Sequence, residues 1–233
     1  MEFIIQVKRQ ESPNSPPYLQ SFIVEDDGEA AIAAVLEELN SRTPLVDADG
    51  KTAEPIFWEC SCLQRKCGAC AMRINGAPKL ACSQFLRDFP KRRITLEPLA
   101  KFPIVSDLIV DRSVLFKHCK EAGLWLEDKA SLPERRHEAL YQSARCLMCG
   151  CCLEVCPNFV CGEDFCGAAL SVNAYRIFEQ SGHGEHRKEM AAEYRKRYWN
   201  GCSQSLSCHE VCPVKLPVED LLVRSNAIAV WNR

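Results

Sequence analysis

Sixteen cysteines in a chain of 233 residues constrain this protein more than any other feature of its sequence. Disulfides, zinc and iron–sulfur clusters are the candidate uses of so much sulfur. The N-terminal segment MEFIIQVKRQ has no basic region followed by an apolar stretch, so we expect no export signal. A reducing compartment disfavours disulfides, and a chain of this length does not need them for stability. The sequence therefore indicates a protein that binds metal.

The first cysteine group has the spacing of a plant-type ferredoxin. Four residues separate Cys62 from Cys67, two separate Cys67 from Cys70, and eleven more precede Cys82. This spacing is typical of a [2Fe–2S] cluster, with three thiolates on one loop and the fourth on a later strand. A zinc ribbon would need two separated CxxC pairs, and this group contains one. Cys60 does not fit the spacing, and we interpret it as a buried apolar thiol or a spare.

The second group, CLMCGCCLEVCP, has the spacing of a bacterial ferredoxin. Two residues separate Cys146 from Cys149 and Cys149 from Cys152, and three more precede Cys156 in a Cys-Pro pair. Cys151 falls outside this spacing. In two-cluster proteins the fourth cysteine of such a run binds the other cluster. The sequence therefore predicts a second cluster and a further cysteine group to complete both.

The last group supplies the missing ligands. Five residues separate Cys202 from Cys208, and three more precede Cys212 in a second Cys-Pro pair. The crossing of ligands then predicts a [4Fe–4S] set of Cys146, Cys149, Cys152 and Cys212. The other cluster keeps Cys156, Cys202 and Cys208, and Ser205 stands where a fourth ligand would fall. Three thiolates and a serine predict a [3Fe–4S] cluster, although serine or water bound to a fourth iron is an alternative.

Eleven predicted ligands leave five further cysteines, which we expect to be ordinary core thiols. They are Cys60, Cys119, Cys151, Cys161 and Cys166. His209 lies beside Cys208, and we expect a hydrogen-bonding residue at a helix end rather than a proton or quinone site. Lys215 follows the second Cys-Pro pair, where a solvated lysine and a cation that stabilises a reduced cluster or a quinone are equally good interpretations.

The N-terminal part of the chain reads as a small α+β domain. Apolar patterns predict strands at 3–7 and 21–24, a helix at 29–42 and a strand at 92–99. Residues 71–82 predict a hairpin, because Asn-Gly at its centre favours a two-residue turn. The segment 97–113 contains two prolines and reads as a connector.

The C-terminal part reads as helical. Predicted helices span 112–127, 133–149, 167–180 and 217–231. We place the domain boundary near residue 105. The [2Fe–2S] cluster is then expected in domain 1–105, and the [4Fe–4S] and [3Fe–4S] clusters in domain 106–233.

Charge and hydropathy exclude two classes of protein. The chain has 29 basic and 31 acidic side chains, and this balance argues against a nucleic-acid partner. The basic run HRKEMAAEYRKRYW is best interpreted as a solvated helix face. No apolar run reaches the 18 residues of a membrane span, so the chain is not expected to cross a membrane itself.

Five motifs in order resemble the iron–sulfur subunit of succinate dehydrogenase and fumarate reductase: CGACAMRINGAPKLAC, LEPLAKFPIVSDLIVDRS, CLMCGCCLEVCPN, FCGAALSVNAYRIF and CSQSLSCHEVCPVKLP. The resemblance covers nearly the whole chain. It implies a ferredoxin-like domain of the β-grasp type followed by an all-α helical ferredoxin domain. It also implies an electron-transfer subunit with no substrate chemistry of its own.

The resemblance further implies partners. One is a flavoprotein subunit with covalent FAD, and the other is a membrane anchor, for example of the cytochrome b type, where quinone binds. Such a subunit lies at the cytoplasmic face of the cell membrane, held there by its anchor. Succinate and fumarate interconvert on the flavoprotein.

Departures from the family pattern bear on the quinone. Cys161 and Ser203 stand where ubiquinone-linked members carry tryptophan and histidine. In addition, LQRK replaces an Arg-Glu-Gly motif in the first loop, and GAA replaces the common GPA after the cluster loop. The FWECSC and CPN stretches resemble menaquinone-linked bacterial members, so we expect menaquinone. An alternative is a related reductase with a different substrate or a thiol-linked donor. A protein with structural zinc is a third hypothesis.

Overall fold

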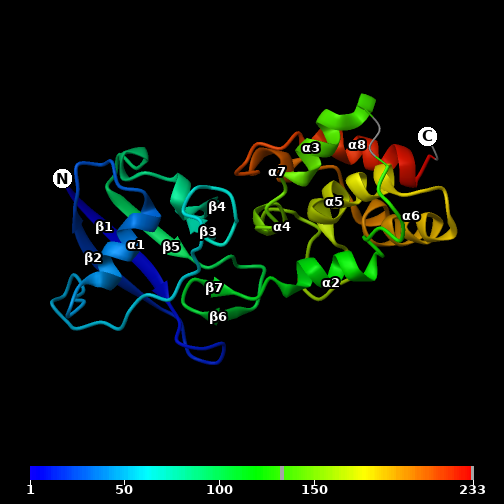
Figure 1. The fold of residues 1–233 in the computed structure, drawn as a ribbon. Helices are drawn as coiled ribbons and strands as arrows, with labels where there is room; N and C mark the ends of the chain where they lie inside the picture. Colours follow the sequence, from blue (N-terminus) through cyan, green and yellow to red (C-terminus); the bar gives the residue numbers. More distant parts are fainter. Residues whose placement is uncertain (132–133, 232–233) are drawn as a thin grey trace. The chain divides into compact units, whose positions relative to one another are not determined.

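The computed structural model describes residues 1–131 and 134–231, which form two compact units, Met1–Asp111 and Arg112–Arg233. The first carries the strands and one α-helix, and the second is helical (Figure 1). Among the described residues, no helix is both long enough and apolar enough to cross a membrane.

The first unit is built on a five-stranded sheet in the order β2-β1-β5-β3-β4. The strands are β1 (Glu2–Arg9), β2 (Tyr18–Glu25), β3 (Ala71–Ile74), β4 (Ala77–Leu80) and β5 (Arg93–Glu97). β1 pairs antiparallel with β2 and parallel with β5, while β3 pairs antiparallel with both β5 and β4. This mixed sheet with one helix confirms the predicted β-grasp fold.

The apolar side chains of this unit lie in one core. Alternate residues of β1 are buried, as the strand period requires, and α1 (Ile32–Ser41) buries one face. That face consists of Ile32, Ala33, Val35, Leu36 and Leu39. The observed helix is shorter than the predicted 29–42, and β1 and β2 extend beyond the predicted strands at both ends.

The β3–β4 hairpin turns at Asn75 and Gly76, as predicted. Both residues have positive φ, at +49° and +81°, which a tight two-residue turn requires. The Asn75 backbone N–H donates to the Thr95 carbonyl at 2.8 Å, and Asn75 Oδ1 accepts from the Thr95 N–H at 2.7 Å. The turn is therefore held to β5, and β4 leads directly into the short 3₁₀-helix η1 (Ala81–Ser83) that carries Cys82.

The predicted connector is partly ordered as a small two-stranded sheet. Its strands are β6 (Ile104–Ser106) and β7 (Ile109–Val110). The Asp107 carboxylate between them accepts the backbone N–H groups of Gln10 at 2.9 Å and Phe57 at 3.0 Å. These contacts tie the segment to the first unit, which ends at Asp111. The boundary that the sequence suggests at residue 105 falls inside β6.

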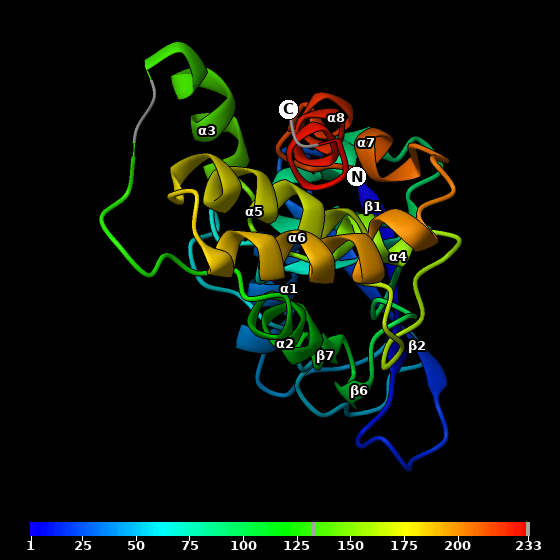
Figure 2. The same cartoon turned by 90° about the vertical axis from the view of Figure 1, so that its right-hand side faces the viewer.

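The second unit packs around α5 (Gly167–Gln180), whose residues 167–175 are all buried. The other helices are α2 (Ser113–Glu121), α3 (His137–Ala144), α4 (Cys151–Glu154), α6 (Glu185–Arg197), α7 (Ser207–Glu210) and α8 (Val218–Ala229), with η3 (Glu134–Arg136) and η4 (Trp199–Gly201) as short 3₁₀ turns. In Figure 2, α6 runs beside α5, and α5 also packs against α8, α3, α2 and α4. This confirms the predicted all-α domain.

The predicted helices differ from the observed ones mainly at their ends. α5 has the predicted bounds, but α2 ends at Glu121, shortly before Gly123 with φ +68°. α3 ends at Ala144, so residues 145–150 form a loop instead of the predicted continuation to 149. Pro133, where that prediction begins, lies outside the described residues. The basic run forms α6, which buries Met190, Ala191 and Tyr194 and is otherwise polar.

Candidate cluster-binding sites

The first candidate site is the loop that precedes β3. Leu63, Arg65 and Gly68 have φ values of +54°, +60° and +78°, so the chain winds tightly and turns its amide groups inward. The backbone N–H groups of Gln64 and Lys66 both donate to Cys62 Sγ at 3.3 Å. The Ala69 N–H lies 3.5 Å from Cys67 Sγ. The loop therefore surrounds its sulfur atoms with hydrogen-bond donors.

These donors make Cys62 an unusual thiol. The backbone hydrogen bonds from Gln64 and Lys66 lower the pKa of Cys62 from 9.0 to about 7, with a contribution from the Cys67 side chain. Hydrogen bonds of this kind favour the thiolate, which is the form that binds metal. The loop is thus suited to hold an anionic sulfur at neutral pH.

Cys70 and Cys82 complete the same group. Cys70 is 3% exposed, and burial raises its pKa to about 12, with additional repulsion from the thiols of Cys82 and Cys67. The Ala81 N–H donates to the Cys70 carbonyl at 3.0 Å, which holds the end of the hairpin against the loop. The structure therefore brings the four predicted cysteines of this group together.

A second candidate site is a small cavity of about 30 Å³ in the helical unit. Among its lining residues are Cys146, Cys149, Cys152, Cys208 and Cys212. The first three come from the loop 145–150 and the start of α4, where Met148 and Gly150 have φ values of +51° and +87°. Cys212 arrives from the end of α7, sixty residues after Cys152 in the sequence. Cys212, the last cysteine of the last group, thus lies beside the first three cysteines of the second group.

The thiols of this cavity influence one another. Burial raises the pKa of Cys152, and the neighbouring Cys149 and Cys146 raise it further. Burial likewise raises the pKa of Cys146, with additional repulsion from Cys149 and Cys212. Cys149 differs, because a hydrogen bond from the Cys151 side chain lowers its pKa to about 7. Four thiolates here would repel one another unless a cationic centre neutralised them.

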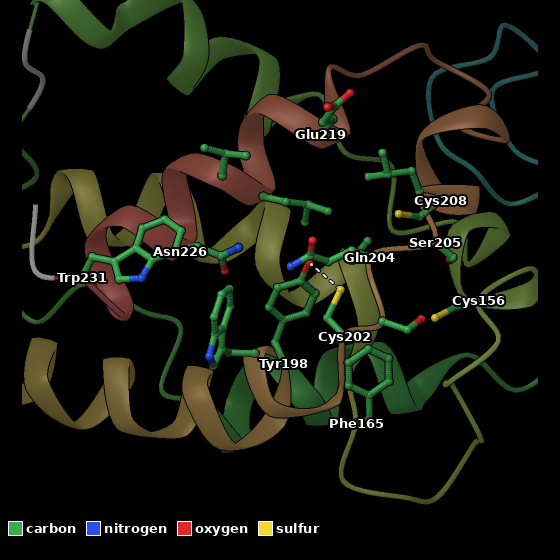
Figure 3. A pocket seen from close by; sticks show the side chains of 16 residues that line it. Cys156, Phe165, Tyr198, Cys202, Gln204, Ser205, Cys208, Glu219, Asn226 and Trp231 are labelled. Atoms are coloured by element: carbon green, nitrogen blue, oxygen red, sulfur yellow. Dashed lines mark hydrogen bonds between the residues drawn. The ribbon is translucent and has the colours of Figure 1, made fainter.

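The third candidate site is a cavity of about 310 Å³, shown in Figure 3. Cys156, Cys202 and Cys208 line it, and Ser205 lies on the same wall. Burial raises the pKa of Cys208 to about 11, and the neighbouring Cys156 and Cys202 raise it further. The cavity therefore contains the three predicted thiols and the predicted serine.

Aromatic and apolar side chains enclose the rest of this cavity. They include Phe165, Tyr198, Trp199, Leu222 and Trp231. The rings of Trp199 and Trp231 meet edge to face, with their centroids 5.6 Å apart. Gln204 and Leu206 have φ values of +58° and +56°, so the backbone between Cys202 and Cys208 winds as the first cysteine loop does. The cavity therefore has an apolar wall on one side of its three partly buried thiols.

The five other cysteines do not share one environment. Cys151 and Cys166 are buried, as expected of core thiols, and burial raises the pKa of Cys166 to about 12. Cys119 and Cys161 are partly buried, and burial raises the pKa of Cys119 to about 11. Cys60 is exposed, so its interpretation as a buried thiol is wrong. The other interpretation, a spare cysteine that binds no cluster, stays a prediction.

The two polar residues near the last group also have defined positions. His209 lies in the last turn of α7, where its backbone N–H donates to the Leu206 carbonyl at 2.9 Å. Its side-chain Nδ1 is buried and has no hydrogen-bond partner among the described residues. Lys215 is exposed, with φ +54°, which favours the solvated interpretation.

Sequence reasoning missed the residues that surround Cys202. The Tyr198 hydroxyl lies 3.4 Å from Cys202 Sγ, and Phe165 stacks on the Tyr198 ring. A tyrosine four residues before a predicted ligand, in YWNGC, was the available signal. It could not be interpreted without knowing that η4 turns the chain back between these two residues.

The donor sets fit iron–sulfur clusters. Each of the three groups gathers cysteine sulfurs around a tightly wound loop, and two of the groups line cavities. Desolvation penalises several of the thiolates until a cation binds. Among the residues at 1–131 and 134–231, no three His, Cys, Asp or Glu side chains are arranged to hold a single metal ion.

Comparison with known proteins agrees with this division. Residues 4–117 match the family model described as "2Fe-2S iron-sulfur cluster binding domain". Residues 142–216 match the model described as "4Fe-4S dicluster domain". The fold is similar to a chain of the Mycobacterium smegmatis Sdh1 complex in the apo form, with a TM-score of 0.78 and 20% identity over 100% of this chain and 97% of that chain.

Two curated relatives extend over most of the sequence. The succinate dehydrogenase iron–sulfur subunit of Bacillus subtilis is 31% identical over 97% of this chain and 90% of its own length. The fumarate reductase iron–sulfur subunit of Wolinella succinogenes is 31% identical over 90% of this chain and 88% of its own length. The chain therefore belongs to the family of iron–sulfur subunits of succinate dehydrogenase and fumarate reductase, the electron-transfer subunits of these oxidoreductases.

Proposed function

We propose that this chain is a three-cluster electron carrier. The [2Fe–2S] ligands are Cys62, Cys67, Cys70 and Cys82. The [4Fe–4S] ligands are Cys146, Cys149, Cys152 and Cys212. The [3Fe–4S] ligands are Cys156, Cys202 and Cys208.

The observation that carries this proposal is the exchange of cysteines between the two cavities of the helical unit. Cys212 lines the cavity of Cys146, Cys149 and Cys152, while Cys156 lines the cavity of Cys202 and Cys208. Two-cluster ferredoxins exchange their ligands in this way. The exchange occurs here together with the 2-2-3 cysteine spacing and the Cys-Pro ending of ferredoxins, which zinc ribbons with their separated CxxC pairs do not have.

The three sites differ in what the chain provides around the sulfurs. When bound, such clusters supply one-electron transfer at potentials that their surroundings set within a range of about −700 to +450 mV. The backbone N–H groups of Gln64 and Lys66 offer hydrogen bonds to Cys62 Sγ, which stabilise negative charge there. The cavity of Cys156, Cys202 and Cys208 offers an apolar wall and a single phenol.

The proposed partners follow from the relatives. The chain assembles with a flavoprotein subunit that carries FAD and interconverts succinate and fumarate. It also binds a membrane-anchor subunit where quinone reacts, with menaquinone expected because Cys161 and Ser203 replace tryptophan and histidine. The chain then lies at the cytoplasmic face of the cell membrane, held by that anchor. The relatives give no support to a reductase of another substrate.

The proposal is tested on the complex purified without oxygen. Low-temperature EPR of the oxidised sample is expected to show a [3Fe–4S] signal that disappears on mild reduction, when a [2Fe–2S] signal appears. The same sample is expected to oxidise succinate with a quinone analogue. Colourless protein that contains zinc and no iron would refute the whole proposal, and an iron protein without the oxidised-state signal would refute the three-iron assignment.

A further inference from the structure

Tyr198 places its hydroxyl against the sulfur of a proposed cluster ligand. The hydroxyl oxygen lies 3.4 Å from Cys202 Sγ, and Figure 3 shows this contact on the wall of the 310 Å³ cavity. Sulfur accepts hydrogen bonds at longer distances than oxygen, so 3.4 Å is a normal O–H···S length. The Tyr198 side chain is 2% exposed, so water does not compete for its proton.

The ring of Tyr198 is fixed on both of its sides. Phe165 stacks on it with centroids 6.1 Å apart and an interplanar angle of 18°. Tyr194 packs at 5.1 Å and 49°. Gly201 makes room for Phe165, because a Cβ there would lie 2.6 Å from a Phe165 ring carbon. The phenol is therefore held in one place by packing, before any cluster binds.

The direction of the hydrogen bond follows from the chemistry of the ligand. A cysteine that binds iron is a thiolate without a proton, so the phenol must donate. Within the described part of the chain, Cys202 Sγ is the hydrogen-bond partner of this hydroxyl. A buried donor with one acceptor keeps that bond, because breaking it would leave a polar group unpaired in an apolar wall.

We infer that Tyr198 is a positioning residue that raises the reduction potential of the cluster held by Cys156, Cys202 and Cys208. This inference rests on the ligand assignment proposed above. A proton donated to a ligand sulfur withdraws negative charge from the cluster and stabilises its reduced state. The tyrosine keeps its proton throughout, and its effect is electrostatic.

Tyr194 provides a matched control. It is also buried and packs against the Tyr198 ring. Its hydroxyl, however, forms hydrogen bonds with Ser171 Oγ at 2.6 Å and Asn226 Oδ1 at 2.7 Å. It donates to no ligand sulfur in these contacts. Removing this hydroxyl therefore removes buried hydrogen bonds from the same core while leaving Cys202 bonded to Tyr198.

The experiment is an EPR-monitored redox titration of the oxidised-state signal in the whole complex. Tyr198→Phe is expected to shift its midpoint to a more negative potential while the signal shape and iron content persist. Tyr194→Phe is expected to leave the midpoint unchanged. An unchanged midpoint in Tyr198→Phe, or an equal shift in Tyr194→Phe, would overturn the inference alone. Absence of the signal from the unmodified complex would overturn the cluster assignment and the inference with it.

A second variant keeps the test valid if Tyr198→Phe does not retain its cluster. Incorporating 3-fluorotyrosine at position 198 makes the phenol a stronger donor with little change in size. The midpoint is then expected to move in the opposite direction, to a less negative potential. A midpoint equal to that of the unmodified complex would count against the inference.

Discussion

The side chains of Arg9 and Asp107 form a buried ion pair, with 3.1 Å between Arg9 Nε and an Asp107 carboxylate oxygen. The two side chains are 4% and 2% exposed. The same carboxylate accepts the backbone N–H of Phe57, just before the segment that carries the first cysteine group. One carboxylate thus joins the first strand, the entry to the cysteine loop and the last hairpin of the N-terminal unit.

Replacing Asp107 should therefore destabilise this unit strongly. We expect Asp107→Ala to lower the free energy of unfolding by about 3–5 kcal/mol, because it leaves the buried Arg9 guanidinium without a counter-charge. Urea unfolding followed by circular dichroism measures the change. Glu38→Ala is the control, since its partner Arg42 and Glu38 itself are 32% and 51% exposed, and such surface pairs contribute about 0–1 kcal/mol. Equal losses in both variants would contradict this role for Asp107.

The exchange of ligands between the two helical-unit cavities can be tested with two buried cysteines. We expect Cys212→Ala to lose the [4Fe–4S] cluster, because this residue supplies the fourth thiol of that cavity. Cys151→Ala should retain the cluster, since Cys151 falls outside the ferredoxin spacing and hydrogen-bonds to Cys149 instead. Iron analysis and EPR of the reduced protein measure both results. Loss of the cluster in Cys151→Ala with retention in Cys212→Ala would reverse the assignment.

The proposed three-iron assignment rests on Ser205, which stands where a fourth cysteine ligand would fall. A thiol at this position would offer a fourth ligand on the wall shared with Cys202 and Cys208. We expect Ser205→Cys to bind a [4Fe–4S] cluster there and to lose the oxidised-state EPR signal. Ser203→Cys is the control, because the Ser203 hydroxyl instead donates to Asn158 Oδ1 at 3.0 Å. A persistent signal in Ser205→Cys would show that position 205 does not reach the fourth iron.

His118 should make stability depend on pH. It is 4% exposed, its Nδ1 is unpaired among the described residues, and burial lowers its pKa below the ordinary 6.5. Below about pH 6.5 the unfolded chain takes up a proton that the folded chain does not. The free energy of unfolding therefore decreases as the pH is lowered below about 6.5, by at most about 1.4 kcal/mol per pH unit for this group.

This pH dependence is measured by urea unfolding at pH 7.5, 6.5 and 5.5. His118→Phe should flatten the slope and keep the edge-to-face contact with Phe159, whose ring centroid is 6.4 Å away. His137→Gln, at an exposed position on α3, should leave the slope unchanged. An undiminished slope in His118→Phe would exclude His118 as its source.

Cysteine spacing predicted the grouping of thiols better than hydropathy predicted the ends of helices. Spacing carries the geometry of the loop itself, so Cys212 and Cys156 lie in the cavities that ligand crossing assigns to them. Helix ends depend on local backbone conformation instead. The apolar pattern continues past Ala144, but the turn at Met148 and Gly150 needs left-handed φ values that periodicity does not report.

The surroundings of the sulfurs were the least predictable part. The contact between Tyr198 and Cys202 depends on packing by Phe165, a residue 33 positions earlier than Tyr198. Likewise, the sequence predicted a connector where β6 and β7 form. The buried Asp107 carboxylate between them bonds to Gln10 and Phe57, which lie 97 and 50 positions earlier in the sequence. A single sequence does not show such distant partners.

The crossed lining of the two cavities also has a consequence for biosynthesis. One cavity needs Cys212 from near the end of the chain, and the other needs Cys156 from the middle together with Cys202 and Cys208. A nascent chain that stops before residue 202 contains neither complete cavity, even though the stretch 146–156 is already present. The two cavities therefore depend on the same late segment of the sequence, and they can form only after nearly the whole polypeptide has been translated.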